Sequence, residues 1–392
     1  MTKLAELNPL ALAIPAPPVP TVGAWRRNYD GRRGPLIDLS QAVPGYPPHA
    51  QMLEWLGEAA ATAAYAGYGA IEGDDELRAV YAVHQSALYG AGIDAKNVHI
   101  TAGCNQAFVA VVMALAQAGE GVALTVPFYF NHESSLGMLG VKPVLIETTA
   151  ENGFVPELRA IEAALEAGVK VVSLITPNNP TGAVYPPELI ASAFDACREH
   201  GAWLILDETY RDFLAPEASV PHRLFERQDW EKTLISLYSF SKSFCIPGHR
   251  MGAVTAGEHV VRALAGIVDN LQICSPRPPQ AALAKAIPAL VDWREANRVE
   301  IALRAEAMAQ SFSDLEGWQL ASLGAYFAFV RHPVAGRSSV DVAEALARDR
   351  GVLVIPGEFF GADQKDYLRF AFANAGIEGI RALRERLEGF SL

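Results

Sequence analysis

From about residue 50 onward, the chain alternates between segments typical of strands and segments typical of helices. Strands are expected at residues 97–101, 121–126, 141–147, 170–176, 202–206, 233–238 and 251–256. Amphipathic helices are expected after most of them, for example at 106–117, 157–166 and 187–199. Two strand segments, VVSLI and WLILD, are continuously apolar, which is typical of strands buried on both faces. The alternation therefore predicts an α/β fold, with helices covering both faces of a mostly parallel sheet.

The pattern changes after about residue 290. A long charged helix is expected at 291–313, and it is followed by a strand at 325–331 and a helix at 340–350. Two more strands, at 351–355 and 367–372, precede a final helix. We interpret this part as a smaller α+β domain that the N-terminal segment completes. The predicted organisation is an N-terminal arm with part of the small domain (1–45), a large domain (46–289) and a small C-terminal domain (290–392).

The N-terminal segment is rich in proline. Residues 14–24 (IPAPPVPTVGA) contain four prolines and cannot be helical throughout, so we expect an extended arm of the kind that docks on a partner subunit. The apolar stretch at 10–14 is too short for a signal peptide. No run approaches the roughly 18 apolar residues that a membrane-spanning helix requires. A membrane protein is therefore not expected.

Charge and cysteine content exclude several other classes. The net charge is −12, and the one basic cluster, Arg26-Arg27 with Arg32-Arg33, is interrupted by four other residues. A nucleic-acid partner is therefore not expected. The four cysteines (Cys104, Cys197, Cys245 and Cys274) are far apart and form no CxxC pair, which indicates neither a disulfide framework nor a metal site. We expect a cytoplasmic protein without a metal.

One lysine stands in an unusual setting. Lys242 lies among Ser239, Ser241 and Ser243, directly after the strand expected at 233–238, and Arg250 follows eight residues later. Open α/β sheets bind ligands at the carboxyl ends of their strands. Desolvation and a nearby arginine lower the pKa of an amine, as a lysine that forms a Schiff base requires. The alternative is a solvated lysine in a surface loop, and this stretch by itself does not decide between them.

Four other strand ends carry polar or aromatic residues. Gly103-Cys104-Asn105 opens a helix, where backbone N–H groups favour phosphate, although a simple turn would also use the glycine. Asn179 lies between two prolines, either as an oriented hydrogen-bond donor or as part of a turn. Asp207 ends an apolar strand, where a carboxylate is costly unless a cation faces it. Tyr210 could reach the same pocket, and Tyr129 offers an aromatic face there.

Taken together, these strand ends place a phosphate cradle, an aromatic ring, an amide, a carboxylate and a lysine at one edge of one sheet. The ordered set resembles the class I/II, fold-type I, pyridoxal-phosphate-dependent aminotransferases, and the resemblance runs from about residue 36 to the C-terminus. The motifs that carry it are Gly103, Pro127-Phe128-Tyr129, Asn179-Pro180-Thr181-Gly182, Asp207-Glu208-Thr209-Tyr210, and Ser239-Phe240-Ser241-Lys242 with Arg250.

The resemblance implies a role for each of these residues. Lys242 would hold pyridoxal 5'-phosphate as a Schiff base and would later move a proton at the substrate carbon. Asp207 would keep the pyridine nitrogen protonated. Asn179 and Tyr210 would bind the phenolic oxygen of the cofactor, and Tyr129 and Thr209 would lie against its two ring faces.

The resemblance also implies the phosphate and substrate contacts. The phosphate would be held by Ser239, Arg250 and the backbone of Gly103, Cys104 and Asn105, with Ser241 close by. Tyr68 resembles the family tyrosine that reaches the phosphate of the neighbouring subunit, which implies a homodimer with shared active sites. Arg369 resembles the arginine that binds the substrate α-carboxylate.

The sequence indicates the substrate less clearly than the cofactor. Many relatives have glycine at the position of Ala42, so the additional methyl group is expected to narrow the site. Some relatives that prefer aspartate carry lysine where this chain has Asn105, so neutral or aromatic amino acids are expected to be favoured here, with Tyr46, Phe128 and Tyr129 expected at the pocket. The expected function is amino transfer between an L-amino acid and a 2-oxo acid.

Two alternatives belong to other classes. A carbon–sulfur β-lyase, or a related lyase or synthase on the same fold, would keep every cofactor residue, so the motifs leave this alternative open. An aminotransferase-like effector domain of a transcription regulator would need an added DNA-binding segment, for which we see no room before residue 36.

Overall fold

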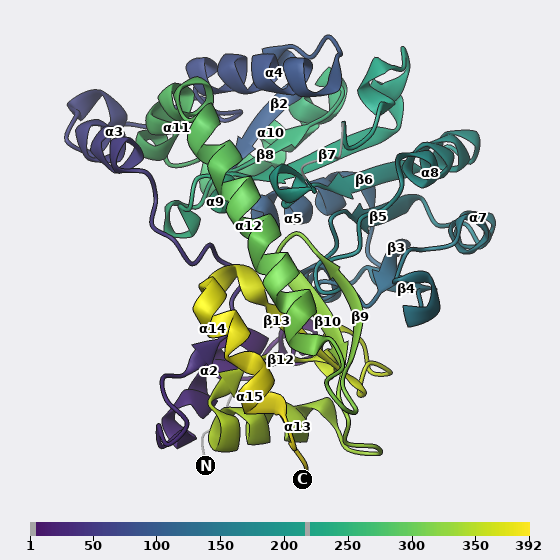
Figure 1. Cartoon of the computed structure of the whole chain (residues 1–392). Helices are drawn as coiled ribbons and strands as arrows, with labels where there is room; N and C mark the ends of the chain where they lie inside the picture. Colours follow the sequence, from purple (N-terminus) through teal and green to yellow (C-terminus); the bar gives the residue numbers. More distant parts are fainter. Residues whose placement is uncertain (1–4, 216–219) are drawn as a thin grey trace.

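The structure is a computed structural model that describes residues 5–215 and 220–392. Figure 1 shows a large part and a small part, with the long helix α12 (Val291–Phe312) running from one to the other. The large part is built on a seven-stranded sheet and the small part on a four-stranded sheet. This confirms the predicted α/β fold with a smaller second domain. The domain boundaries at residues 45 and 289 stay a prediction.

The strands of the large sheet follow the order β2-β8-β7-β6-β5-β3-β4. They are β2 (Val98–Thr101), β3 (Gly121–Val126), β4 (Lys142–Glu147), β5 (Val171–Ile175), β6 (Trp203–Asp207), β7 (Leu234–Ser239) and β8 (Gly252–Thr255). β8 is antiparallel to both of its neighbours, and all other pairs are parallel. Every strand except β8 therefore runs in one direction, so the carboxyl ends of the other strands lie at one edge.

Helices cover both faces of this sheet. One face packs against α3 (Ala50–Ala60), α4 (Asp75–Tyr89), α7 (Leu158–Glu166), α8 (Pro187–Glu199) and α11 (Arg277–Ala289). The other packs against α5 (Cys104–Leu115), α6 (Phe130–Met138) and α10 (Glu258–Gln272). Strand β6 shows the alternation, because Leu204 and Leu206 point into the first core and Ile205 into the second. Burial on both faces is what the continuous apolar run predicted.

The small part is an antiparallel sheet with the strand order β12-β13-β10-β9. Its strands are β9 (Gln319–Gly324), β10 (Phe327–Arg331), β12 (Ile355–Pro356) and β13 (Tyr367–Ala371). The helices α13 (Ser339–Ala345), α14 (Ile377–Arg381) and α15 (Leu383–Leu387) contribute side chains to the same core. The N-terminal segment joins this part through β1 (Ile37–Asp38), which pairs in parallel with β11 (Val352–Leu353). The N-terminal segment thus pairs with a strand of the C-terminal part, and its assignment to the small domain stays a prediction.

Several expected boundaries in the small part are wrong. β9 was not predicted, because its residues are half-buried or exposed and show no apolar alternation. The strand expected at 325–331 begins two residues later, since Ala325 has a φ of 44° in the turn after β9. The strand expected at 351–355 is two short strands with different partners, β11 and β12. The helix expected at 340–350 continues from α13 as a π-helical turn at residues 346–350, and the final helix is two short helices.

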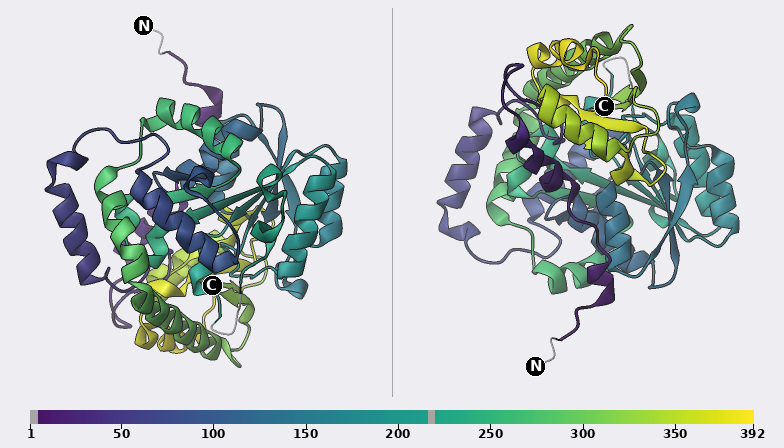
Figure 2. Two further views of the ribbon diagram at one scale, coloured as in Figure 1. Left: turned by 90° about the horizontal axis from the view of Figure 1, so that it is seen from above. Right: turned by 90° about the horizontal axis from the view of Figure 1, so that it is seen from below.

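The expectation of an extended N-terminal arm is also wrong in part. Residues 15–17 are not helical, but Pro18–Trp25 form helix α2, after a short helix α1 (Pro9–Leu12). Pro18 and Pro20 lie in the first turn of α2, where backbone N–H groups have no partner within the helix, so proline is tolerated there. Figure 2 shows this purple segment passing along the small part toward the large one. In the part of the chain that the structure describes, no helix combines the length and apolarity needed to cross a membrane.

A close backbone contact joins the two parts. The loop after β5 approaches the β9–β10 turn at Gly182 and Gly324, and a Cβ on Gly324 would lie 2.3 Å from the carbonyl oxygen of Gly182. That space can hold only a hydrogen atom, so the contact requires glycine at position 324.

We therefore expect Gly324→Ala to lower the free energy of unfolding by about 1–3 kcal/mol, the usual cost of overpacking. Gly266→Ala is the matched control, because Gly266 lies in α10 and a Cβ there would meet nothing within 4 Å. The control should be neutral or more stable by about 0.4–1 kcal/mol. Equal denaturation midpoints for the two variants would contradict the close contact.

Candidate active site

A cavity of about 170 Å³ lies at the carboxyl edge of the large sheet. It is lined by side chains that follow the ends of different strands, as the strand directions require. The lining residues are Cys104, Asn105, Tyr129, Ile175, Asn179, Asp207, Thr209, Tyr210, Ser239, Ser241, Lys242, Pro247 and Arg250. All of these except Ile175 and Pro247 are residues that the sequence predicted at a cofactor site. The structure thus brings together side chains from positions 104 to 250.

One end of the cavity combines a helix N-terminus with an arginine. Gly103 begins α5 with a φ of 84°, a conformation that favours glycine. A Cβ on Gly103 would lie 2.2 Å from Nη2 of Arg250, so the guanidinium group lies directly on this backbone. Gly252 of β8 allows the close approach, because a Cβ there would lie 2.7 Å from the carbonyl carbon of Gly103. A helix N-terminus with an arginine beside it favours a phosphate group.

The same cavity is lined by the buried carboxylate of Asp207. Its Oδ2 atom lies 3.4 Å from Nε2 of His132 and 3.5 Å from the thiol of Cys104, and its Oδ1 accepts a hydrogen bond from the backbone N–H of Thr209 at 3.0 Å. Burial alone would raise the pKa of Asp207, but His132 and Thr209 more than compensate and hold this pKa below its usual value. The group is therefore an anion inside the protein. A cation was expected opposite Asp207, and a histidine lies there.

Sequence reasoning missed His132. Its ring stacks on Phe108 of α5, with the centroids 3.7 Å apart, and meets the Tyr129 ring edge-on at 5.3 Å. The available signal was its spacing: His132 follows Tyr129 by three residues in α6, which places both on one side of the helix. The contact with His132 thereby orients the Asp207 carboxylate.

Two tyrosines form walls of the cavity. Burial and the nearby Asp207 raise the pKa of Tyr129 to about 12, and the side chain of Asn131 donates to its hydroxyl at 2.9 Å. Burial raises the pKa of Tyr210 well above its usual value, so both phenols are protonated donors at neutral pH. Tyr210 also packs on Phe327 of β10, which connects this wall to the small part.

Lys242 reaches into the cavity from α9 (Phe240–Ser243), the single turn that follows β7. Its Nζ atom donates to the backbone carbonyl of Ala42 at 2.6 Å. Burial, with the positive charges of Arg250 and Arg369, lowers the pKa of Lys242 to about 8. This carbonyl contact was not foreseen, since only the methyl group of Ala42 was considered. The lowered pKa makes the amine available as a nucleophile near neutral pH.

Arg369 enters from strand β13 of the small part and is 2% exposed. Nη1 donates to Oδ1 of Asn179 at 3.0 Å, and Nη2 donates to the carbonyl oxygen of Ser40. The guanidinium carbon lies 5.1 Å from the ring centroids of both Phe327 and Phe360. Burial lowers the pKa of Arg369 to about 10, so it remains a cation at neutral pH. The same contacts orient the Asn179 amide.

Six predicted residues are not among those that line the cavity. Gly103, Ala42 and Arg369 contact lining residues, as described above, and Tyr68, Tyr46 and Phe128 lie elsewhere. Tyr68 is 79% exposed, and Gly69 beside it donates its N–H to the sulfur of Cys274. Tyr46 packs edge-on against Trp293, and Phe128 lines a separate small cavity that shares Tyr129. The expectation that Tyr46 and Phe128 line the main pocket is therefore wrong, because the chain turns both rings into neighbouring contacts.

The residues present fit the expected cofactor. A Cβ at position 103 would collide with Arg250, so the backbone there forms the kind of cradle that a phosphate uses. The buried anion Asp207 lies in the same cavity and is matched to a protonated ring nitrogen. Lys242 supplies an amine whose pKa suits covalent attachment. The phosphate, the ring nitrogen and the carbonyl carbon of pyridoxal phosphate thus each have a complementary group.

Comparison with known proteins supports the same assignment. Residues 34–387 match the family model described as aminotransferase class I and II. The chain is 28% identical to an aspartate aminotransferase of Sulfolobus acidocaldarius over 363 residues, which cover 89% of each chain. It is 28% identical to an aromatic aminotransferase of Arabidopsis thaliana over 358 residues, or 90% of this chain and 88% of the relative.

Its fold is similar to that of aspartate aminotransferase from Thermus thermophilus, with a TM-score of 0.88, 24% identity, and coverage of 98% of this chain and 99% of that chain. The family match spans nearly the whole chain, both sheets included. The chain therefore belongs to the class I and II aminotransferases, which depend on pyridoxal 5'-phosphate.

Proposed function

We propose that this aminotransferase moves an amino group from a neutral or aromatic L-amino acid to a 2-oxo acid, with Lys242 as the residue that carries the cofactor and moves the proton. The observation that carries this proposal is one cavity that contains a lysine of lowered pKa, a buried anion and a helix N-terminus with an arginine beside it. Arg369 lies within hydrogen-bonding distance of the same cavity wall.

Different lining residues would hold different parts of the cofactor. Ser239, Arg250 and the N-terminus of α5 would bind the phosphate, and Asp207 would bind the ring nitrogen. Asn179 and Tyr210 would bind the phenolic oxygen. When bound, pyridoxal phosphate supplies a carbonyl carbon for the amine and a ring that accepts electrons from the substrate carbon.

The ring faces would be covered by Tyr129 and Thr209, which limits the access of water. Lys242 Nζ is the base that would remove the proton from the substrate α-carbon and return it during the second half of the reaction. An amine with a pKa of about 8 can hold and release a proton at neutral pH, as this step requires.

Arg369 is the proposed site for the substrate α-carboxylate. Its guanidinium group is buried, and in the described residues its hydrogen-bond partners are two neutral oxygens, not a carboxylate. Its Nε atom is buried and has no hydrogen-bond partner among those residues. A buried cation without a paired anion is costly, so the binding of a carboxylate would stabilise this part of the structure.

The side-chain preference rests on Asn105, which lines the cavity. An amide offers a neutral hydrogen bond where a lysine would offer a charge-assisted one, and the difference is on the order of 1 kcal/mol. The names of the relatives include both an aspartate and an aromatic aminotransferase, so they favour neither choice. Asn105 favours the neutral or aromatic substrate.

We also propose that the enzyme is a cytoplasmic homodimer with shared active sites. The exposure of Tyr68 supports this, since its ring is free to reach a partner subunit. All four cysteines lie in described residues and are free thiols, which is compatible with a reducing compartment.

The first prediction concerns Lys242. The rate at which the protein freed of cofactor attaches pyridoxal phosphate should rise with pH and level off above about 8, because the neutral amine is the nucleophile and its pKa is about 8. Absorbance of the attached cofactor measures the rate. Lys242→Ala should show neither this absorbance nor turnover, and an active Lys242→Ala enzyme would refute the mechanism.

The second prediction concerns substrate preference. With one fixed 2-oxo acid, kcat/KM for aspartate should not exceed that for phenylalanine or methionine, because Asn105 supplies no charge. Asn105→Lys should raise kcat/KM for aspartate about fivefold or more relative to phenylalanine. If the unaltered enzyme favours aspartate by tenfold or more, about 1.4 kcal/mol, another cation binds the distal carboxylate.

The third prediction concerns Tyr68. If its hydroxyl reaches the phosphate in the partner subunit, Tyr68→Phe should release pyridoxal phosphate about fivefold more readily, the effect of roughly 1 kcal/mol. Tyr65→Phe, the same change three residues away, is the control and should retain the cofactor normally. Sedimentation that finds a fully active monomer would rule out a shared site.

A further inference from the structure

The turn that carries Lys242 is too short to hold itself in place. Helix α9 has four residues, and single helical turns are not stable in isolation. Its backbone is tied by the N–H of Phe240 to the carbonyl of Met251, and by Phe244 to Phe240 within the turn. Phe240 packs into the core on one side. The position of Lys242 therefore also depends on the contacts that hold the end of the turn.

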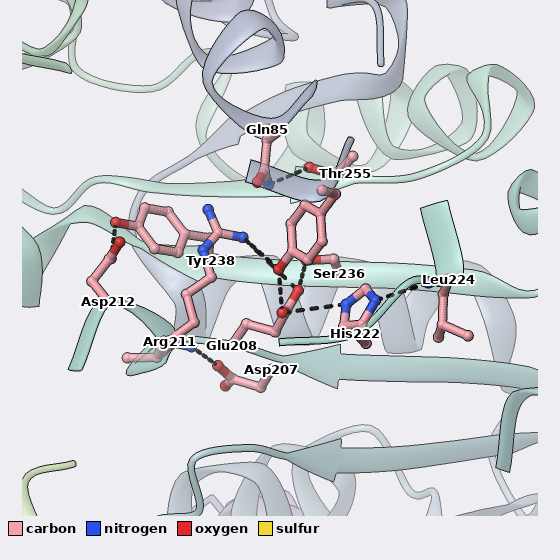
Figure 3. A network of polar contacts seen from close by, with 12 residues as sticks. Gln85, Asp207, Glu208, Arg211, Asp212, His222, Leu224, Ser236, Tyr238 and Thr255 are labelled. Carbon is pink, nitrogen blue, oxygen red and sulfur yellow. Dashed lines mark hydrogen bonds and ion pairs between the residues drawn. The ribbon is translucent and has the colours of Figure 1, made fainter. Parts of the chain in front are cut away.

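Ser243 supplies that second attachment. Its hydroxyl donates to Oδ2 of Asp212 and lies 2.7 Å from the hydroxyl of Tyr238. Tyr238, on β7, donates to the same Asp212 oxygen at 2.5 Å, and Figure 3 shows its ring directed at that carboxylate. Ser243 was the one serine around Lys242 for which the family resemblance implied no role. It is 2% exposed and follows Lys242 directly.

Two arginines stabilise the charge of Asp212. Burial would raise its pKa, but Arg211 and Arg294 outweigh this effect and keep the pKa below its usual value. The guanidinium carbon of Arg211 lies 4.1 Å from the centroid of the Tyr238 ring. Arg294, near the start of α12, lies 3.9 Å from the other Asp212 oxygen. The carboxylate that holds Ser243 is thus a charged, buried and oriented acceptor.

Arg211 also connects Asp212 to the strand that carries Asp207. Nη1 of Arg211 lies 3.9 Å from Oε2 of Glu208, the residue after Asp207. Glu208 is fully buried and accepts hydrogen bonds from Ser236 at 2.6 Å and from Tyr89, with His222 at 3.3 Å (Figure 3). Burial would raise the pKa of Glu208, but His222 and Arg211 outweigh this effect and lower it to about 2. A continuous polar cluster thus links the end of β6 to α9.

We propose that Asp212 and Ser243 are positioning residues, and that the hydrogen bond between them places Lys242 relative to Asp207. Both Lys242 and Asp207 must contact one cofactor ring, so a shift of α9 relative to β6 would misalign the amine. A displacement of about 1 Å can slow a reaction by about a hundredfold. This inference rests on the proposed role of Lys242.

The chain contains a matched control. Ser236 is also a buried serine, 1% exposed, that donates to a buried carboxylate, but its carboxylate is that of Glu208 and it does not adjoin Lys242. Ser236→Ala and Ser243→Ala therefore each remove one hydroxyl group from a similarly buried site. A general loss of stability would affect both variants alike, whereas loss of positioning would affect Ser243→Ala alone.

The experiment measures the melting temperature and kcat of each purified holoenzyme. It also measures the rate at which the same variant, freed of cofactor, attaches pyridoxal phosphate. The melting temperatures of the two variants should fall by similar amounts. Ser243→Ala should lower kcat and the attachment rate about tenfold or more, and Ser236→Ala should change either by less than about threefold.

Asp212→Asn provides a second test, because it keeps the shape of the side chain and removes its charge. If Asp212 acts through Ser243, the double variant Asp212→Asn/Ser243→Ala should attach the cofactor no more slowly than the slower single variant, since one change weakens and the other removes the same hydrogen bond. Independent, multiplicative effects would contradict a shared action.

The outcomes separate this inference from the proposed function. If Lys242→Ala abolishes attachment but Ser243→Ala matches Ser236→Ala in both rates, the positioning role is wrong and the proposed function stands. If the unaltered protein attaches no pyridoxal phosphate to Lys242, the proposed function fails and this inference fails with it.

Discussion

Two neighbouring carboxylates at the end of β6 have to be buried, and much of the structure serves to compensate them. A buried, unpaired carboxylate costs several kcal/mol, so each needs its own set of partners. Asp207 lines the cavity, lies beside the His132 ring and accepts a hydrogen bond from the N–H of Thr209. Glu208 lies on the other side and is surrounded by a hydroxyl network and Arg211. One carboxylate therefore remains available to a ligand, and the other belongs to the scaffold.

Arg369, on β13 of the small part, is a buried cation that likewise needs partners. It brings a buried positive charge to the cavity edge, where Asn179 and Ser40 supply only neutral oxygens. The two aromatic rings beside it stabilise the charge, by about 2 kcal/mol or more for each desolvated pair. A carboxylate ligand would complete this site, so under the proposed function the packing of the small part on the large one would also create the site for the substrate carboxylate.

Helix α12 connects these features. Its first turns place Arg294 near Asp212 behind the Lys242 turn, and its later turns place Arg304 against the carbonyl of Ala373 at 2.7 Å. The same helix thus contacts the residues that support the Lys242 turn and the core of the small part. The two parts also meet at the close backbone contact between Gly182 and Gly324, which requires glycine.

Much of this could be predicted from the sequence, because strand and helix periods are local. Residues that follow parallel strands must meet at one edge, so the sequence assigns Asn179, Asp207 and Lys242 to one cavity, as the structure shows. The reversed direction of β8 and the existence of β9 could not be predicted, since strand direction and an irregular burial pattern depend on pairing partners.

The sequence by itself determined the order of the strands along the chain and the groups that follow them. Only the tertiary structure decided that His132 faces Asp207, that Lys242 contacts the carbonyl of Ala42 and that Ser243 is held by Asp212. Of these, the Ala42 contact joins residues 200 positions apart, and all three depend on side-chain direction. A local pattern cannot specify them, because packing of the whole chain determines which side chains share a buried space.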